Sequence, residues 1–163
     1  MSAVLGLDYG ERRVGVAAGE RDLGVATGIT TIHFASRREL RAALAELVNE
    51  REPELIVVGY PRTLSGEPGE RCRAVETFAG RLFGWFSIPV VYQDERLTSV
   101  EADRIRRKAG SRAEGQAGKG MIDMASAVLI LQGWFDAARA GTDAGTGPAP
   151  AGGSGAPDPA QGR

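Results

Sequence analysis

Residues 55–59 form an unbroken apolar run, Leu-Ile-Val-Val-Gly, and this run most constrains how the chain folds. A run of this length without polar alternation is typical of a strand whose two faces are both covered by helices. Segments with helical periodicity stand on either side of it, as expected where crossover helices connect parallel strands. The sequence therefore predicts an α/β fold around a partly parallel sheet.

Three earlier strands are expected to pair with one another in antiparallel fashion. Residues 3–9 and 14–18 are short apolar runs joined by a glycine-containing loop, which is the pattern of a β-hairpin. Residues 24–33 are rich in Val, Ile and Thr, and Gly24 and Gly28 indicate a bend or a bulge. A group of three antiparallel strands therefore precedes the parallel part of the sheet.

The first helices are predicted from capping signals and from apolar residues at spacings of three and four. Ser36 with Glu39 forms a capping-box pattern, and the periodic leucines after it continue up to Pro53. A second periodic segment ends near Phe86 and leads to a fifth strand at residues 90–93. This order predicts a mixed five-stranded sheet, three antiparallel strands and then parallel strands, flanked by helices.

The next part of the chain is predicted as a basic helix, a loop and a final helix. Thr98 with Glu101 repeats the capping-box pattern and begins a helix that ends at Gly110. Residues 111–119 contain two glycines and no large apolar side chain, which is typical of a mobile loop. The last helix is expected at about residues 121–138.

The end of the chain has a different composition. Residues 141–163 include 7 Gly, 4 Pro and 5 Ala and no aliphatic or aromatic side chain larger than Ala. A segment of this composition buries too little apolar surface to offset the entropy of ordering it. We expect one folded domain at residues 1–140 and a disordered tail at residues 141–163.

Charge and cysteine usage exclude several classes of protein. The formal net charge is −1, so a nucleic-acid partner must be bound by a local patch rather than by the overall charge. The single cysteine, Cys72, and the single histidine, His33, exclude an internal disulfide and a Cys/His zinc cage. No apolar run is long enough to span a membrane, and the start of the chain lacks the layout of a signal peptide. We expect a cytoplasmic protein without a membrane partner.

Acidic residues stand at the ends of three predicted elements. Asp8 ends the first strand, Asp94-Glu95 ends the fifth strand, and Asp123 lies in the first turn of the last helix. An α/β sheet gathers such positions at the carboxyl ends of its strands, where clustered carboxylates raise one another's pKa unless a cation binds. Oxygen ligands favour Mg²⁺ or Mn²⁺ over zinc, and two such ions about 4 Å apart assist phosphodiester cleavage.

Two questions about these carboxylates stay open at this level. Asp8 followed by Tyr9-Gly10 is also the pattern of a turn carboxylate that caps a hairpin. Asp94 and Glu95 occupy successive strand positions, so only one of them faces the site. If the strand with Gly59 lies between the first and the fifth strands, Asp8 and Glu95 begin roughly 10 Å apart, with a glycine between them that leaves room.

A basic segment follows the fifth strand. From Arg96 to Lys119 there are seven basic and three acidic residues. Such a run is either a solvated helix face or a surface that neutralises nucleic-acid phosphates, with binding that is salt-sensitive and largely independent of sequence. The candidate substrate-binding residues, three of them from other parts of the chain, are Arg12, Arg13, Arg62, Arg96, Arg106, Arg107 and Lys119.

Four motifs, in chain order, resemble those of the YqgF/RuvX family. They are Leu7-Asp8-Tyr9-Gly10 with residues 12–17, residues 56–61 with Ser65-Gly66, residues 94–99, and residues 119–127. The resemblance covers about residues 3–138, and four motifs in sequence at this length are specific. It implies an RNase H-like fold. Members of the family are bacterial proteins described as pre-16S rRNA nucleases and as Holliday-junction resolvase-like enzymes.

The resemblance also implies an activity and a set of site residues. It points to a cytoplasmic, metal-dependent nuclease that matures the 5′ end of 16S rRNA, with branched DNA as a related substrate. Catalytic and metal-binding roles carry over to Asp8, Glu95 and Asp123, which favours Glu95 over Asp94. We expect Mg²⁺ or Mn²⁺ as cofactor, a nucleic-acid partner, and a monomer or weak homodimer.

Two other functions compete with this one. Sugar kinases and actin-like ATPases open with a similar Asp-x-Gly hairpin, but they need a second lobe that about 140 residues do not supply. A noncatalytic RNA-binding factor of ribosome assembly keeps the fold without turnover, and its cellular function would survive Asp8→Asn.

Overall fold

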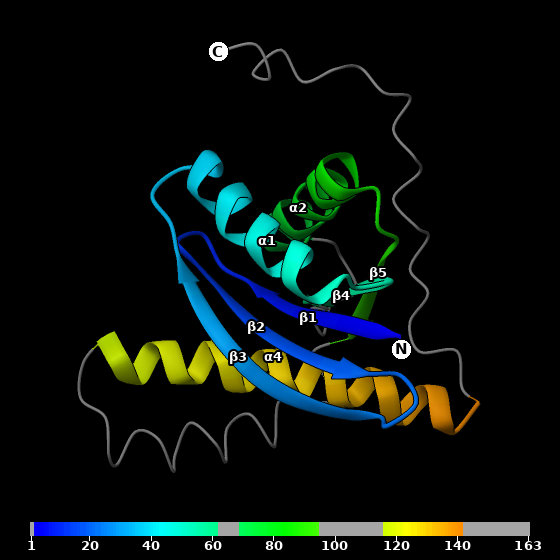
Figure 1. Ribbon diagram of the computed structural model, residues 1–163. Coiled ribbons are helices and arrows are strands. Elements are labelled where there is room, and N and C mark those ends of the chain that lie inside the picture. Colours follow the sequence, from blue (N-terminus) through cyan, green and yellow to red (C-terminus); the bar gives the residue numbers. More distant parts are fainter. Residues whose placement is uncertain (1, 62–68, 95–115, 142–163) are drawn as a thin grey trace.

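A computed structural model of the chain describes residues 2–61, 69–94 and 116–141, with side chains from residue 124 onward in the last segment. A five-stranded sheet forms the middle of three layers (Figure 1). Two helices cover one face of the sheet and a long helix covers the other. No helix in the described part of the chain has the length and apolar character needed to cross a bilayer.

The sheet has the mixed topology that the sequence predicts. Its strands stand in the order β3-β2-β1-β4-β5. Strand β2 pairs antiparallel with β1 and β3, while β4 pairs parallel with β1 and β5. A register shift opposite Val16 and Ala17 leaves Ile29 unpaired and confirms the predicted bulge beside Gly28. The strand bounds are β1 Ala3–Tyr9, β2 Arg13–Glu20, β3 Val25–His33, β4 Leu55–Tyr60 and β5 Val90–Asp94.

Helix α1 (Arg37–Arg51) begins where the capping signal predicts. The backbone N–H of Glu39 donates to Ser36 Oγ at 3.2 Å, and the N–H of Ala35 donates to Glu39 Oε2 at 2.9 Å. These bonds satisfy two donors at the start of the helix, each side chain serving the backbone near the other. Helix α2 spans Glu70–Phe86, the position of the second predicted helix.

The last helix, α4 (Gln116–Arg139), begins about five residues earlier than predicted. Residues 116–119 of the predicted loop are therefore helical, and Asp123 lies about two turns into the helix instead of in its first turn. The prediction was wrong because Gly118 and Gly120 weaken the local helix signal, whereas extending a helix that is already packed on the sheet costs little. The predicted helix at 98–110, the rest of the loop and residues 142–163 of the tail lie outside the described residues.

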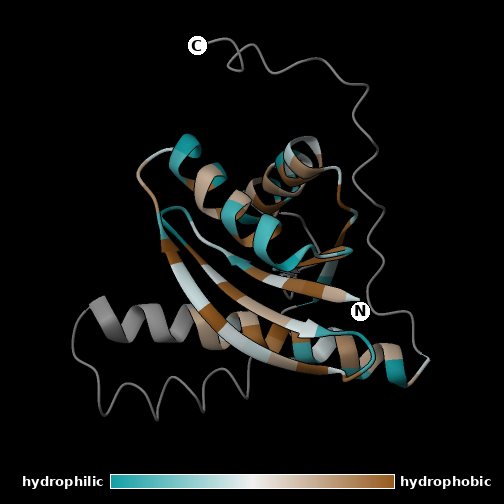
Figure 2. Cartoon of the chain, in the orientation of Figure 1, coloured by the Kyte–Doolittle hydropathy of each residue, from teal (hydrophilic) through white to brown (hydrophobic). Residues whose placement is uncertain are grey.

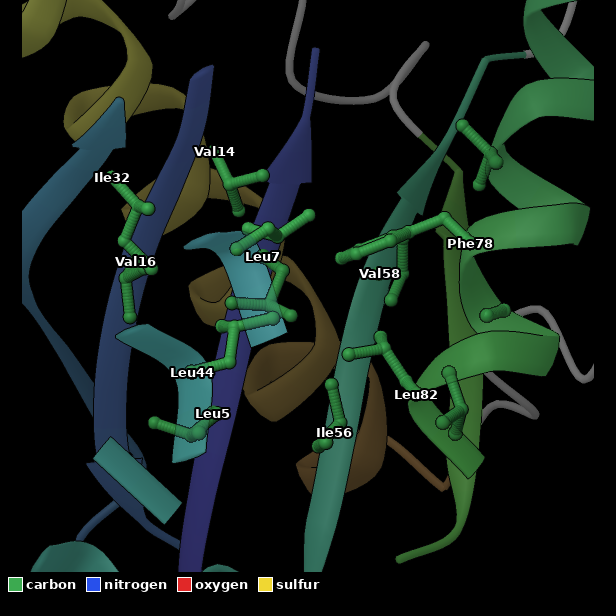
Figure 3. Close-up of a cluster of buried hydrophobic side chains, with 14 of the residues drawn as sticks. Leu5, Leu7, Val14, Val16, Ile32, Leu44, Ile56, Val58, Phe78 and Leu82 are labelled. Atoms are coloured by element: carbon green, nitrogen blue, oxygen red, sulfur yellow. The ribbon is translucent and has the colours of Figure 1, made fainter. Parts of the chain in front are cut away.

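Strand alternation divides the core into two clusters. Leu5 and Leu7 of β1 face α1 and α2, in the cluster of buried side chains drawn in Figure 3. Val4 faces α4, where Val57, Leu131 and Phe135 join it. Figure 2 shows that the strands are largely hydrophobic, whereas much of α1 is hydrophilic. The apolar run at residues 55–59 is thus buried from both sides, as the sequence predicts.

Helix α4 approaches β1 closely at Gly6. A Cβ added to Gly6 would lie 2.6 Å from Leu131 Cβ and 3.2 Å from the carbonyl oxygen of Ala127. Both values are shorter than ordinary van der Waals contact, so any larger residue pushes the helix away from the sheet. Gly6 therefore fixes the distance between α4 and the strand that carries Asp8.

We predict that Gly6→Ala lowers the free energy of unfolding by about 1–3 kcal/mol, because the added methyl group overpacks this contact. Gly80→Ala is the matched control, since a Cβ at this exposed position of α2 meets nothing within 4 Å. It is expected to raise the free energy of unfolding by about 0.5–1 kcal/mol, because alanine is the better helix former. Urea denaturation measures both changes, and a Gly6→Ala variant as stable as the wild type contradicts the prediction.

Candidate active site

Asp8 lies near the carboxyl end of β1, on the face of the sheet that α4 covers. Strand alternation places it on the same face as Val4 and Gly6. Gly15 is its register partner on β2, and Gly59 of β4 stands one position beyond the Leu7–Val58 pair. Because both neighbours are glycines, neither adjacent strand places a side chain beside Asp8 on this face. The sequence predicts that Gly59 leaves room beside Asp8, and the strand register shows that Gly15 does the same on the other side.

The next strand continues this row across the sheet. Gly59 pairs with Gln93 of β5, so Asp8, Gly59 and Gln93 follow one another on the α4 face. Tyr60 pairs with Asp94 one position later, on the opposite face. Asp94 therefore does not share a face with Asp8, and the strand order that the distance argument requires, with β4 between β1 and β5, is confirmed.

Gln93 is an anomaly within the described residues. It is the one buried polar side chain of the described core, 3% exposed, and its Oε1 has no hydrogen-bond partner there. Leaving such an oxygen unpartnered costs about 1–3 kcal/mol. The Asp8 carboxylate and the unpartnered amide oxygen of Gln93 have only a glycine between them. Oxygen atoms of these two kinds are the ligands that hard cations such as Mg²⁺ or Mn²⁺ prefer.

Helix α4 brings a second acidic position toward this edge of the sheet. Met124 lies against Gly28 of β3, and Ala127 lies against Gly6 of β1. Asp123 stands one helical turn before Ala127, in the half of α4 that lies toward the end of β1 (Figure 1). The side chains of Lys119 and Asp123 lie outside the described residues.

Several predicted site residues fall in segments that the structure does not describe. These are Arg62, Glu95, Arg96, Arg106 and Arg107. Within the described ranges, no three His, Cys, Asp or Glu side chains form a group that could hold a metal ion. The described residues include Asp8 but not the side chains of its two expected partners, Glu95 and Asp123.

The opposite face at the same edge carries a tyrosine cluster. Tyr60 donates its hydroxyl hydrogen to Glu76 Oε1 at 2.8 Å, and its ring lies 5.0 Å from that of Tyr92. The hydrogen bond to Glu76, with burial, raises the pKa of Tyr60, and burial raises the pKa of Tyr92. The buried thiol of Cys72 donates to the carbonyl oxygen of Pro61 at 2.7 Å. The Tyr60 hydroxyl and the Cys72 thiol therefore make hydrogen bonds within the fold, on the face of the sheet opposite Asp8.

Basic side chains gather at the turn next to Asp8. Arg12 is exposed in the β1–β2 turn, and Arg13 pairs with His33 across β2 and β3. The backbone N–H of Phe34 donates to the carbonyl oxygen of Arg12 at 3.1 Å, which ties this turn to the segment that enters α1. The exposed Arg37 and Arg38 of α1 follow three and four residues later. Sequence reasoning missed them, although the Arg-Arg pair directly after a predicted N-cap was visible.

A sequence model described as "RuvX: Holliday junction resolvase" matches residues 2–137. The chain belongs to the RuvX family. A Dechloromonas aromatica protein named "Putative pre-16S rRNA nuclease" is 42% identical over 136 residues, which cover 83% of this chain and 92% of that protein. A Synechocystis protein of the same name is 43% identical over 137 residues, which cover 84% of this chain and 89% of that protein.

Solved structures show the same fold. Thermus thermophilus RuvC in complex with a Holliday junction substrate has a TM-score of 0.52 at 17% identity, covering 87% of this chain and 98% of RuvC. A second structure of Thermus thermophilus RuvC has a TM-score of 0.51 at 16% identity, covering 86% of this chain and 97% of RuvC. At this identity the likeness concerns the fold alone, and it confirms the predicted RNase H-like class.

Family membership confirms the predicted enzyme class. RuvX proteins are nucleases, and the chain is a hydrolase of this kind. The match extends over nearly the whole of the part expected to fold, so it includes the strand that carries Asp8 and the helix that carries Asp123. Membership favours a nuclease over the kinase or ATPase alternative.

We predict that the free energy of unfolding falls as the pH rises above 10.0, the ordinary pKa of tyrosine. The folded-state pKa of Tyr60 is raised, so its contribution is present below pH 10 and is lost as the pH rises further and the unfolded chain ionises first. Tyr60→Phe should make this fall smaller, as measured by urea denaturation between pH 8 and pH 11. Glu76→Gln, which removes the acceptor's charge, should act in the same direction. A Tyr60→Phe profile as steep as that of the wild type contradicts the assignment.

Proposed function

We propose that this chain is a divalent-cation-dependent nuclease that processes the 5′ end of pre-16S rRNA in the cytoplasm. The observation that carries the proposal is Asp8, held near the carboxyl end of a buried strand between two glycines, in a chain that belongs to a nuclease family. We assign residues 1–140 to the nuclease domain and residues 141–163 to a disordered tail. We also expect the protein to act as a monomer or weak homodimer.

Asp8, Glu95 and Asp123 are the proposed ligands of Mg²⁺ or Mn²⁺. Glu95 is preferred to Asp94 because Asp94 lies on the face opposite Asp8, and because the resemblance to the family carries the ligand role over to Glu95. Asp123 qualifies because it stands one turn before Ala127, which packs on the strand of Asp8. When bound, the cation supplies an activated water and stabilises the leaving oxygen of the phosphodiester.

The chain's own residues perform three tasks in this reaction. The rigid strand β1 holds the Asp8 carboxylate in one place, which keeps the donor geometry preorganised. Gly15 and Gly59 leave the space beside Asp8 free of adjacent side chains, so a phosphate group can approach. Basic residues at the same edge neutralise the flanking phosphates and position the strand without reading its sequence.

The substrate-binding residues are proposed on both sides of the carboxylates. Arg12 and Arg13 lie at the β1–β2 turn, and we add to them the exposed Arg37 and Arg38 at the start of α1. The remaining proposed contacts come from segments outside the described residues or from the first turns of α4, and they are Arg62, Arg96, Arg106, Arg107 and Lys119.

Branched DNA is the second candidate substrate. The family is described as Holliday junction resolvase, and RuvC, which was solved with a Holliday junction substrate, shares the fold. Phosphate contacts do not separate RNA from DNA, because the 2′-hydroxyl is the group that distinguishes them. A noncatalytic role in ribosome assembly remains as the outcome in which binding occurs without cleavage.

The proposal is tested by cation-dependent cleavage of a 5′-extended 16S rRNA precursor fragment and of a four-way DNA junction. We predict that wild type cleaves the precursor with Mg²⁺ or Mn²⁺, and that Asp8→Asn abolishes cleavage while binding is largely retained. The reason is that the substitution removes a metal ligand and leaves the arginines in place. Cleavage of the junction alone would identify the DNA enzyme, and binding without cleavage by wild type would identify the assembly factor. Undiminished cleavage by Asp8→Asn would contradict the assigned site.

We predict that Arg12→Ala lowers the slope of log K against log salt concentration by about 1, and that the double change with Arg13→Ala lowers it by up to about 2. Each lost phosphate contact releases one counterion fewer. Arg21→Ala is the control, because Arg21 lies at the opposite end of β2, over Trp134 and paired with Glu54. Fluorescence anisotropy over a range of salt concentrations measures the slopes. Equal slopes for Arg12→Ala and wild type would remove the turn from the binding surface.

A further inference from the structure

Gln93 is not among the predicted site residues, but its environment in the structure is unusual. It lies in the row Asp8, Gly59, Gln93 on the α4 face, two strands away from Asp8, a span of roughly 10 Å at about 4.8 Å per strand. It is 3% exposed, and its Oε1 has no partner among the described residues. Buried oxygens of this kind are commonly satisfied by an ordered water molecule or by a ligand.

A second glutamine of the same helix–sheet interface shows what a structural glutamine looks like in this protein. Gln132 of α4 accepts from the N–H of Ala26 at 3.0 Å through its Oε1. Its Nε2 donates to the carbonyl oxygen of Gly24 at 2.9 Å and to Asp136 Oδ1 at 3.0 Å. Every polar atom of Gln132 therefore has a partner, and these bonds tie the β2–β3 turn to α4.

We propose that Gln93 is a positioning residue for the divalent cation, and that its Oε1 accepts a hydrogen bond from a water molecule of the hydrated ion. This inference rests on the proposed function. Mg²⁺ and ions like it keep several of their waters in proteins, and such waters need acceptors around the site. Asp8 supplies a charged ligand at one end of the row, Gly59 leaves the middle without a side chain, and Gln93 supplies a neutral acceptor at the other end. A neutral amide adds no repulsion to a site that already gathers carboxylates.

The proposal makes Gln93 costly for the fold and useful for the site. Replacing an unsatisfied buried amide with an apolar side chain of similar size removes its desolvation cost, so the metal-free protein should not suffer. The same replacement removes the acceptor for the ion's water and should weaken the ion's binding. A structural glutamine behaves in the opposite way on both counts, and this difference makes the test decisive.

The experiment compares Gln93→Leu with Gln132→Leu in the full-length protein. Thermal unfolding in EDTA gives the Tm of each metal-free variant, and Mn²⁺ titration followed by electron paramagnetic resonance gives the dissociation constant. Gln93→Leu is expected to keep or raise the Tm and to weaken Mn²⁺ binding roughly 10- to 100-fold, the range for residues that act on a metal through its ligands. Gln132→Leu is expected to lower the Tm and to leave Mn²⁺ affinity unchanged. Gln93→Glu retains an oxygen acceptor and should restore most of the affinity.

Two results overturn the inference while leaving the proposed function in place. One is a loss of Tm in Gln93→Leu comparable to that in Gln132→Leu, which would make Gln93 structural. The other is Mn²⁺ affinity in Gln93→Leu equal to that of wild type, when Asp8→Asn has lost it. If wild type itself binds no Mn²⁺ and cleaves neither nucleic acid, the proposed function fails and the inference fails with it.

Discussion

The close packing of α4 against glycines on one face of the sheet is the contact on which the rest of the structure depends. Gly6 of β1 approaches Leu131, Gly19 of β2 approaches Phe135, and Gly28 of β3 approaches Met124, each at a distance that a Cβ would make shorter than 3.0 Å. Each of three adjacent strands thus places a glycine under the same helix. This arrangement fixes the helix against the sheet, and with it the backbone position of Asp123 relative to the strand of Asp8.

Glycines also surround the candidate site. Asp8 is flanked by Gly15 and Gly59 on the neighbouring strands. The face of the sheet that packs against α4 therefore has no side chains next to Asp8 at the carboxyl end of β1. Gln93, next in the row, keeps an oxygen without a partner in the described structure. A core built for stability alone would place an apolar side chain there. Local departures of this kind are expected where a protein gives up stability for a site.

Local signals predicted most of the fold, whereas tertiary contacts decided what they missed. The strand bounds and the Ser36 cap follow from periodicity and turn residues, which are properties of neighbours in sequence. The position of β4 between β1 and β5, which the distance argument only supposed, comes from long-range pairing. The early start of α4 depends on packing, and so does the burial of Gln93, which lies on the edge strand β5 beside Gly59 of β4. Strand alternation placed Asp94 and Glu95 on opposite faces, but only the paired sheet shows that Asp94 shares its face with Tyr60.

A crystal of the full-length protein grown with Mn²⁺ and measured at the manganese absorption edge tests the central claim most directly. The account predicts an anomalous peak at the carboxyl edge of β1, within coordination distance of Asp8, Glu95 and Asp123, with an ordered water between the ion and Gln93 Oε1. Asp8→Asn crystals grown in the same way should lose the peak. A manganese peak elsewhere, or one at this edge that Asp8 does not ligate, would contradict the account.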